Sequence, residues 1–123
     1  MPEAAPTPTL RERVMASVEA LKAENPVLID VEGLTTITDA MIVCTGTSSR
    51  HVTAIAENVI HDAKAAGIRP LGVEGLSESE WVLVDLGDVV LHVMQAQTRA
   101  LYQLEKLWDL GPQDTASSDT ARG

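Results

Sequence analysis

A chain of 123 residues with 45% hydrophobic side chains fits one globular domain, and three aromatic residues without any Phe mean a core of mainly aliphatic side chains. Eighteen acidic against nine basic residues give a formal net charge of −9, which opposes direct nucleic-acid binding and suits a basic protein partner. The single cysteine excludes an internal disulfide, and the lack of a long apolar run or signal-type leader predicts a bacterial cytoplasmic protein with no membrane partner.

The ends of the chain differ in composition from its middle. Residues 1–8 are rich in Pro, Ala and Thr, and residues 111–123 contain few apolar side chains, so both are predicted to be disordered. One folded domain is therefore expected over residues 9–110. Thr9 and Glu12 have the spacing of a capping box, which predicts a helix from Thr9 to about residue 23.

Two strands and a second helix are predicted next. Apolar runs at 27–31 and 40–45 each predict a strand, and Cys44 in the second run is expected to be a small buried hydrophobe. A helical stripe of apolar residues after a serine cap predicts a helix over residues 49–66. Residues 68–73 predict a third strand near a sheet edge, because Pro70 cannot donate a ladder hydrogen bond.

Two Val- and Leu-rich runs, 81–86 and 89–94, flank Gly87-Asp88 and predict a tight hairpin. A two-residue loop places Trp81 opposite Met94, and opposed residues share a face. The first face is expected to be core and comprises Val82, Val84, Leu86, Val89, Leu91 and Val93. The second face comprises Trp81, Leu83, Asp85, Val90, His92 and Met94, with Asp85 and His92 as diagonal neighbours.

A last helix is expected from about residue 97 to residue 110. Its helical spacing places Leu101, Leu104 and Trp108 on one side, and Tyr102 with Glu105 on another. The hairpin is antiparallel, and the helix after the second strand supports a parallel crossover. The predicted class is therefore α/β, with a single mixed five-stranded sheet flanked by helices.

Several polar residues have both a catalytic and a structural interpretation. Asp30 and Glu32 would share a face of a continuing strand, as a metal site or as a solvated strand end. The loop at 46–49 suits an anion at a helix N-terminus, but it lacks the lysine and glycine spacing of known phosphate loops, so a capped turn is expected. His51 in the first turn of that helix is expected to be solvated. A dyad of Asp85 and His92 would suit a hydrolase, although no Ser or Cys nucleophile stands identifiably beside it.

Four separated segments, 39–51, 73–75, 81–93 and 99–108, resemble in order the motifs of the ribosomal silencing factor family, also called Iojap-like. The resemblance covers about residues 10–110. It implies a nucleotidyltransferase-like topology and a cytoplasmic translation regulator that is not an enzyme and uses no cofactor. Such a factor binds the large ribosomal subunit through ribosomal protein fourteen and sterically blocks joining of the small subunit under nutrient limitation. Many members carry an aromatic residue where this chain has Ala40.

The second hairpin face is where the sequence pattern and the resemblance meet. An aromatic anchor with carboxylates around it suits a basic ribosomal protein surface. The expected contact residues are Trp81, Asp85, Asp88 and His92, with Glu74, Tyr102 or Glu105 at the margin.

Three alternatives stay open at this point. In the first, another helix covers the second face, and Asp85 with His92 forms a satisfied buried pair. The second is a divergent nucleotidyltransferase-like enzyme that uses Asp30, Glu32 and Asp85. The third is a homodimer formed through an exposed apolar strand face or the proline-marked edge, which is compatible with the silencing role.

Overall fold

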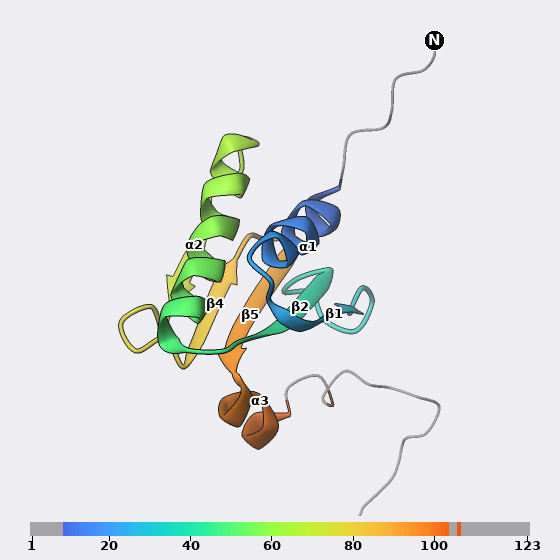
Figure 1. Cartoon of the computed structure of the whole chain (residues 1–123). Helices are drawn as coiled ribbons and strands as arrows, with labels where there is room; N and C mark the ends of the chain where they lie inside the picture. Colours follow the sequence, from blue (N-terminus) through green and yellow to red (C-terminus); the bar gives the residue numbers. More distant parts are fainter. Residues whose placement is uncertain (1–8, 104–105, 107–123) are drawn as a thin grey trace, which may run out of the picture.

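The computed structural model describes residues 9–103 and residue 106 (Figure 1). Its elements in chain order are α1 (Leu10–Ala20), β1 (Glu24–Asp30), β2 (Ala40–Gly46), α2 (Ser49–Ala65), β3 (Gly72–Glu74), β4 (Trp81–Asp85), β5 (Val89–Gln95) and α3 (Ala96–Tyr102). Several predictions lie outside the described residues, namely the disordered lead at 1–8, the disordered tail at 111–123, and the helix positions Leu104, Glu105 and Trp108.

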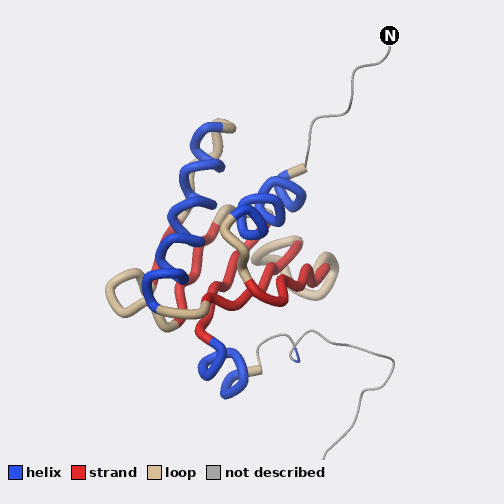
Figure 2. Tube along the Cα trace, viewed as in Figure 1, coloured by secondary structure: helices blue, strands red, loops and turns tan. Residues whose placement is uncertain are grey.

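The five strands form one mixed sheet in the order β1-β2-β5-β4-β3. Strands β2 and β5 are parallel, while the other three neighbouring pairs are antiparallel. The parallel pair requires a crossover, which α2 begins. Helices α1 and α2 pack side by side on one face of the sheet (Figure 2). The predicted α/β class with a single mixed five-stranded sheet is confirmed.

Both long helices begin where side-chain caps predict. The Thr9 hydroxyl accepts a hydrogen bond from the Glu12 backbone at 3.2 Å, and the Glu12 carboxylate accepts one from the Thr9 backbone at 2.9 Å. The Ser48 hydroxyl caps α2 by accepting from the backbone N–H of His51 at 3.1 Å. Helix α1 ends at Ala20, three residues earlier than expected, because Lys22 turns into the left-handed region with a φ of 62°.

Three other predicted boundaries are wrong. Strand β1 begins at Glu24, ahead of residue 27, because a register irregularity accommodates Asn25 and Pro26 within it. Strand β3 covers only Gly72–Glu74, since Pro70 interrupts pairing in the preceding residues. Helix α3 ends before Gln103, whose φ is 45°, and Leu101, which the helical spacing placed on one side with Leu104 and Trp108, is 75% exposed.

The hydrophobic core lies between α1, α2 and the first face of the sheet. All six hairpin residues assigned to the first face are buried there, against side chains such as Val18 of α1 and Ile55 of α2. Burying one such aliphatic side chain completely stabilises the folded state by about 1.5 to 3 kcal/mol relative to leaving it exposed. Cys44 is completely buried, and this burial raises the pKa of its thiol to about 12, so the group stays neutral, as the prediction of a small hydrophobe requires.

No helix among the described residues is long and apolar enough to cross a membrane.

The loop between β3 and β4 depends on a glycine. Gly75 has a φ of +92°, and a Cβ atom at this position would lie 2.1 Å from the carbonyl oxygen of Trp81. The Gly75 carbonyl also accepts a hydrogen bond from the backbone N–H of Ser79 at 2.8 Å. The loop can therefore pass close to the first residue of β4 only if residue 75 has no side chain.

The Gly75→Ala substitution is expected to lower the free energy of unfolding by at least about 2 kcal/mol, because it adds backbone strain and a clash with the Trp81 carbonyl. Urea unfolding followed by circular dichroism measures this change. Gly72→Ala is the matched control, since a Cβ at Gly72 meets no atom within 4 Å. Equal stability of the two variants would contradict the role assigned to Gly75.

Candidate interaction surface

The second face of the sheet, opposite α1 and α2, is organised in rows across the strands. The predicted hairpin register is confirmed from Trp81 opposite Met94 to Asp85 opposite Val90. One row runs through Glu74, Leu83, His92, Val43 and Val27, in the strand order β3, β4, β5, β2, β1. The next row contains Asp85, Val90, Met41 and Ile29. The register thus joins acidic residues at the β3–β4 side to apolar residues towards β1.

Burial on the second face changes from the middle to the margin. In the two central strands His92 is 6% exposed, and Val43 and Met94 are fully buried. At the β4 margin Trp81, Leu83 and Asp85 are half-buried, while Glu74 on β3 is exposed. Another molecule can therefore reach this face at β1, where Val27 is 36% exposed, and at the β3–β4 margin.

Trp81 lies between two other rings at this margin. Its indole Nε1–H donates a hydrogen bond to Nδ1 of His92 at 2.9 Å, and the two ring centroids are 5.9 Å apart. On the α3 side, the centroid of the Tyr102 ring lies 4.9 Å from that of Trp81, with the planes tilted by 48°. Tilted aromatic pairs at such distances are favourable. The indole is thus fixed by a hydrogen bond and by a ring contact from a different element.

The hydrogen bond also defines the state of His92. Because Nδ1 accepts the indole proton, the imidazole carries its own proton on Nε2 and is neutral. Burial lowers the pKa of His92 from an ordinary 6.5 to about 4, since the charged form would lose its hydration. The expected exposed His92 is therefore a buried acceptor that supports Trp81.

Asp85 and His92 are diagonal neighbours as predicted, but they do not form the pair that was left open as an alternative. The Asp85 carboxylate accepts a hydrogen bond from the backbone N–H of Gly87 at 2.9 Å and so shapes the hairpin turn. Both Asp85 and Trp81 are diagonal neighbours of His92, and the imidazole bonds to Trp81. Neither the hydrolase dyad nor the satisfied buried pair of Asp85 and His92 is formed.

The other predicted contact residues lie on β3, in the hairpin turn and on α3. Glu74 is exposed opposite Leu83, and Asp88 is exposed in the hairpin turn, where its carbonyl accepts hydrogen bonds from the backbone N–H groups of Asp39 and Ala40. Tyr102 is 56% exposed while its ring contacts Trp81. Glu105 lies outside the described residues.

The residues of the enzyme alternative do not come together. Asp30 is opposite Ala40, whose side chain is in the core on the first face, whereas Asp85 is on the second face with two strands between them. The Asp30 carboxylate instead accepts from the backbone of Glu32 at 2.9 Å and pairs with Arg11 at 3.5 Å. Asp30, Glu32 and Asp85 cannot act on one metal ion in this arrangement.

The polar groups of the loop at 46–49 are used within the fold. The Thr47 backbone N–H donates to His51 Nδ1 at 2.9 Å, while Nε2 of the same ring lies 2.7 Å from the carbonyl oxygen of Leu21. The expectation of a solvated His51 is wrong, because this ring joins the end of α1 to the start of α2. Ser49 accepts a hydrogen bond from Gln95 at 3.0 Å. The predicted capped turn describes this loop correctly.

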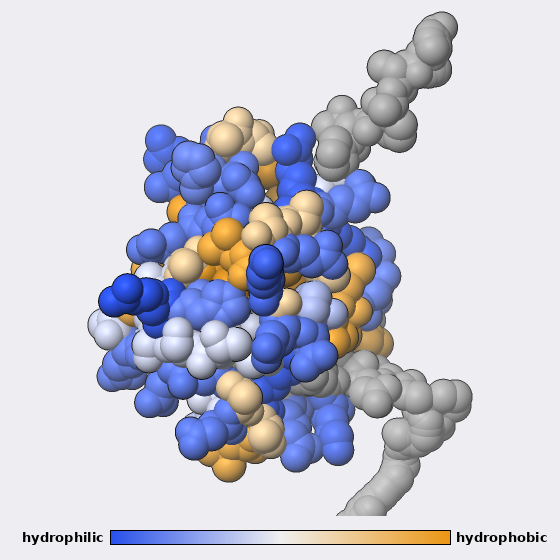
Figure 3. Space-filling model, in the orientation of Figure 1, coloured by the Kyte–Doolittle hydropathy of each residue, from blue (hydrophilic) through white to orange (hydrophobic). Residues whose placement is uncertain are grey.

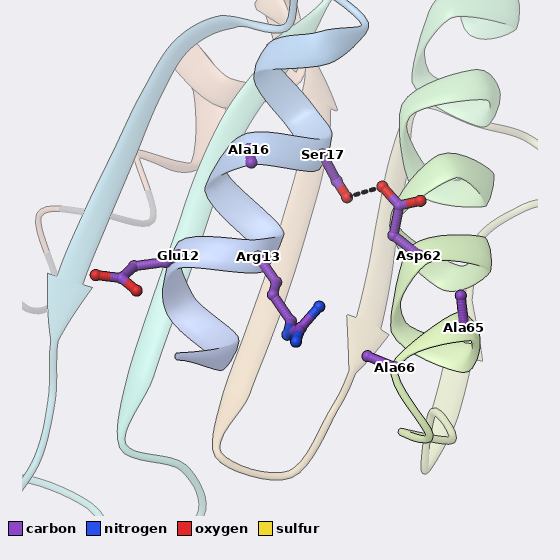
Figure 4. A pocket seen from close by; sticks show the side chains of 7 residues that line it. All are labelled: Glu12, Arg13, Ala16, Ser17, Asp62, Ala65 and Ala66. Atoms are coloured by element: carbon purple, nitrogen blue, oxygen red, sulfur yellow. Dashed lines mark hydrogen bonds between the residues drawn. The ribbon is translucent and has the colours of Figure 1, made fainter. Parts of the chain in front are cut away.

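A groove of about 630 Å³ lies on the helix side of the sheet, between α1 and α2 (Figure 4). Arg13 points into it from α1, and the hydroxyl of Ser17 donates a hydrogen bond to the Asp62 carboxylate across it. Small side chains, Ala16, Ala65 and Ala66, form much of the remaining wall. The groove combines charges of both signs and is separated from the second face by the sheet.

Sequence reasoning missed Arg99 as a residue of this surface. Its Nη1 donates hydrogen bonds to the Asn25 carbonyl at 2.8 Å and to the Thr45 hydroxyl at 2.9 Å. The signal available in the sequence was its position three residues before Tyr102, on the same side of a helix. That spacing does not reveal its partners on β1 and β2.

The neutral state of His92 predicts a pH dependence of stability. The pKa of His92 is lower in the folded state than in the unfolded state, so below pH 6.5 protons bind the unfolded chain first. The stability that neutral His92 supports is therefore complete above pH 6.5 and is lost as the pH falls towards 4. Between pH 7 and pH 4 the protein should lose about 2 to 3 kcal/mol more stability than a His92→Gln variant, which keeps an acceptor but does not titrate. Urea unfolding at each pH gives the two curves, and parallel curves would rule out the effect.

Comparison with known proteins agrees with this structure. The profile of the family described as "Ribosomal silencing factor during starvation" matches residues 4–122. The ribosomal silencing factor RsfS of Haemophilus influenzae is 48% identical over 99 residues, which are 80% of this chain and 97% of that protein. A crystal structure of a Chromobacterium violaceum protein superimposes with a TM-score of 0.80 at 38% identity, over 88% of each chain. A more distant mouse relative, "Mitochondrial assembly of ribosomal large subunit protein 1", is 37% identical over 76 residues, 59% of this chain and 33% of that protein. The chain belongs to the ribosomal silencing factor family.

Proposed function

We propose that this protein binds the large ribosomal subunit through ribosomal protein fourteen and blocks joining of the small subunit. Translation would thereby be repressed under nutrient limitation, in the bacterial cytoplasm and without catalysis or a cofactor. Family membership supports a role at the ribosome, and the mouse relative carries the large subunit in its name. The proposed block is steric, so it requires a rigid contact surface and no chemical step.

The observation that carries this proposal is the arrangement around Trp81. A half-buried indole that is already fixed by His92 and Tyr102 loses little conformational freedom when a partner covers it. Tryptophan and tyrosine are the side chains most often found as energetic anchors of interfaces. Trp81 and Tyr102 are therefore assigned as anchors, and His92 as the group that orients Trp81.

The carboxylates at the same margin suit a basic partner. Glu74 lies on β3 opposite Leu83, two residues from Trp81, while Asp85 ends β4 and Asp88 lies in the hairpin turn, so the carboxylates follow the β3–β4 side of the sheet from near Trp81 to the turn. Opposite charges at the rim of an interface speed the encounter and set its orientation more than they add affinity. Glu105, which lies outside the described residues, stays a proposed contact residue.

We also propose that two copies of the chain can associate through β1, which is an edge strand. Its Val27 and Leu28, together with Leu34 and Ile37 of the following loop, are exposed, and hydrophobic side chains gather over this region (Figure 3). An exposed edge with apolar side chains favours strand pairing with a second chain. The β3–β4 margin lies at the opposite edge, so such a homodimer leaves it accessible.

Trp81→Ala is expected to weaken binding to purified large subunits by at least about 2 kcal/mol, because it removes the central anchor. Co-sedimentation measures binding, and a subunit-joining assay run in parallel should show loss of the block. His61→Ala, on the exposed side of α2, is the control and should bind normally. Unchanged affinity of a correctly folded Trp81→Ala variant would refute the assignment, and failure of the unmodified protein to block joining would refute the silencing mechanism.

The paired substitution Glu74→Gln and Asp88→Asn tests the acidic margin without changing side-chain size. Both groups are exposed, so stability should stay within about 0.5 kcal/mol. Association with large subunits is expected to slow, and its dependence on ionic strength to weaken, while dissociation changes less. Stopped-flow or surface plasmon resonance measurements at two salt concentrations give the association and dissociation rate constants. An unchanged salt dependence of association would exclude these carboxylates from the contact.

A further inference from the structure

Helix α3 has little intrinsic support for its position. It contains seven residues, none of them buried, and no side chain caps its N-terminus. An isolated helix of this length is not stable in water. It projects from the end of β5, away from α1 and α2 (Figure 1). Its placement beside the sheet therefore depends on individual tertiary contacts.

Arg99 supplies such contacts to two strands at once. Its Nη1 donates to the carbonyl oxygen of Asn25 on β1 and to the hydroxyl of Thr45 on β2, at 2.8 and 2.9 Å. Asn25 has a φ of 47° and lies at the irregularity of β1, where regular pairing with β2 is interrupted. This departure from the regular ladder leaves its carbonyl for the guanidinium.

Among the described residues, Arg99 borders a hollow beside α3. This hollow has a volume of about 400 Å³ and separates α3 from the start of β1 and the end of β2. It is lined by Glu24, Asn25, Thr45, Ala96, Arg99 and Ala100. Beside this hollow, the hydrogen bonds of Arg99 to Asn25 and Thr45 attach α3 to β1 and β2.

Tyr102 follows Arg99 by three residues and is its neighbour on the helix surface. An arginine that fixes the helix against β1 and β2 also fixes the position from which the Tyr102 ring reaches Trp81, 4.9 Å away. Arg99 thus connects α3 to β1 and β2, and Tyr102, one turn further along the same helix, connects it to the indole.

We propose that Arg99 is a positioning residue of the ribosome-contact surface, which holds α3 so that Tyr102 supports Trp81 for binding. This role rests on the proposed function of the Trp81 margin. It also places the exposed Leu101, adjacent to Tyr102, within reach of the same partner.

The first test needs no ribosome. In a Trp108→Phe background, Trp81 is the only tryptophan, so its fluorescence reports the indole environment. Arg99→Ala should shift the emission to longer wavelength and increase quenching by acrylamide, because Tyr102 no longer covers one side of the ring. Arg99→Lys, which keeps a cationic donor, should restore most of the original signal. Unchanged emission in Arg99→Ala would overturn the proposal.

The second test measures binding to large subunits in the chain with Trp108 intact. Arg99→Ala is expected to weaken binding by about tenfold, and Arg99→Lys by less. The matched control is Arg11→Ala, which removes another arginine that joins a helix to β1, through Asp30, away from Trp81. Wild-type binding by Arg99→Ala, or equal loss in Arg11→Ala at equal melting temperature, would overturn the positioning role.

Two further variants keep the outcomes separable. If Arg99→Ala does not fold, Thr45→Val, which removes one acceptor of Arg99, should give smaller changes of emission and affinity in the same direction, and no change in either would overturn the proposal. If Trp81→Ala binds like the unmodified protein, the proposed contact surface fails. If Trp81→Ala loses binding while Arg99→Ala keeps it, only the role of Arg99 fails.

Discussion

The pairing register of β4 with β5 is the constraint on which the rest of this structure depends. Side chains alternate between faces, so a slip of one residue would exchange the aliphatic first face with the aromatic and polar second face. The turn at Gly87 and Asp88 fixes the register, and the Asp85 carboxylate supports that turn through the Gly87 backbone. Strand β5 also pairs in parallel with β2, in a register of its own that places Ala40, Ile42 and Cys44 in the core.

The same register supports the contact surface from within the sheet. Burying a neutral imidazole in the central strand gives Trp81 a fixed acceptor, and the cost appears as the lowered pKa of His92. A buried acceptor without a donor would be destabilising, so the two residues stabilise each other. Tyr102 then adds support from a helix that itself has no buried side chain. The surface is rigid where the sheet forms it and depends on Arg99 where α3 contributes.

The fold has three distinct surfaces: the face covered by helices, the β3–β4 margin and the β1 edge. Helices α1 and α2 cover the first face and make the core, so they can change on their outer sides without moving Trp81. The β3–β4 margin combines aromatic and acidic residues in a chain of net charge −9, in keeping with the basic partner proposed above. The β1 edge, with its exposed aliphatic residues, lies on the opposite side of the sheet.

The sequence alone determined the features that local chemistry dictates. Alternation and a two-residue turn set the hairpin register, the Thr9 and Glu12 capping box started α1, and a serine cap started α2. Boundaries at Asn25 and Pro70 were less predictable, because pairing with a neighbouring strand decides whether an irregular residue belongs to a strand. Tertiary structure alone decided that His92 bonds to Trp81 and not to Asp85, that Leu101 is exposed, and that Arg99 reaches β1 and β2. Strand spacing makes Trp81 and Asp85 equivalent diagonal neighbours of His92, and helix spacing only groups residues of α3 by side. Sheet twist, burial and partners distant in sequence decide which neighbour bonds and which side is covered.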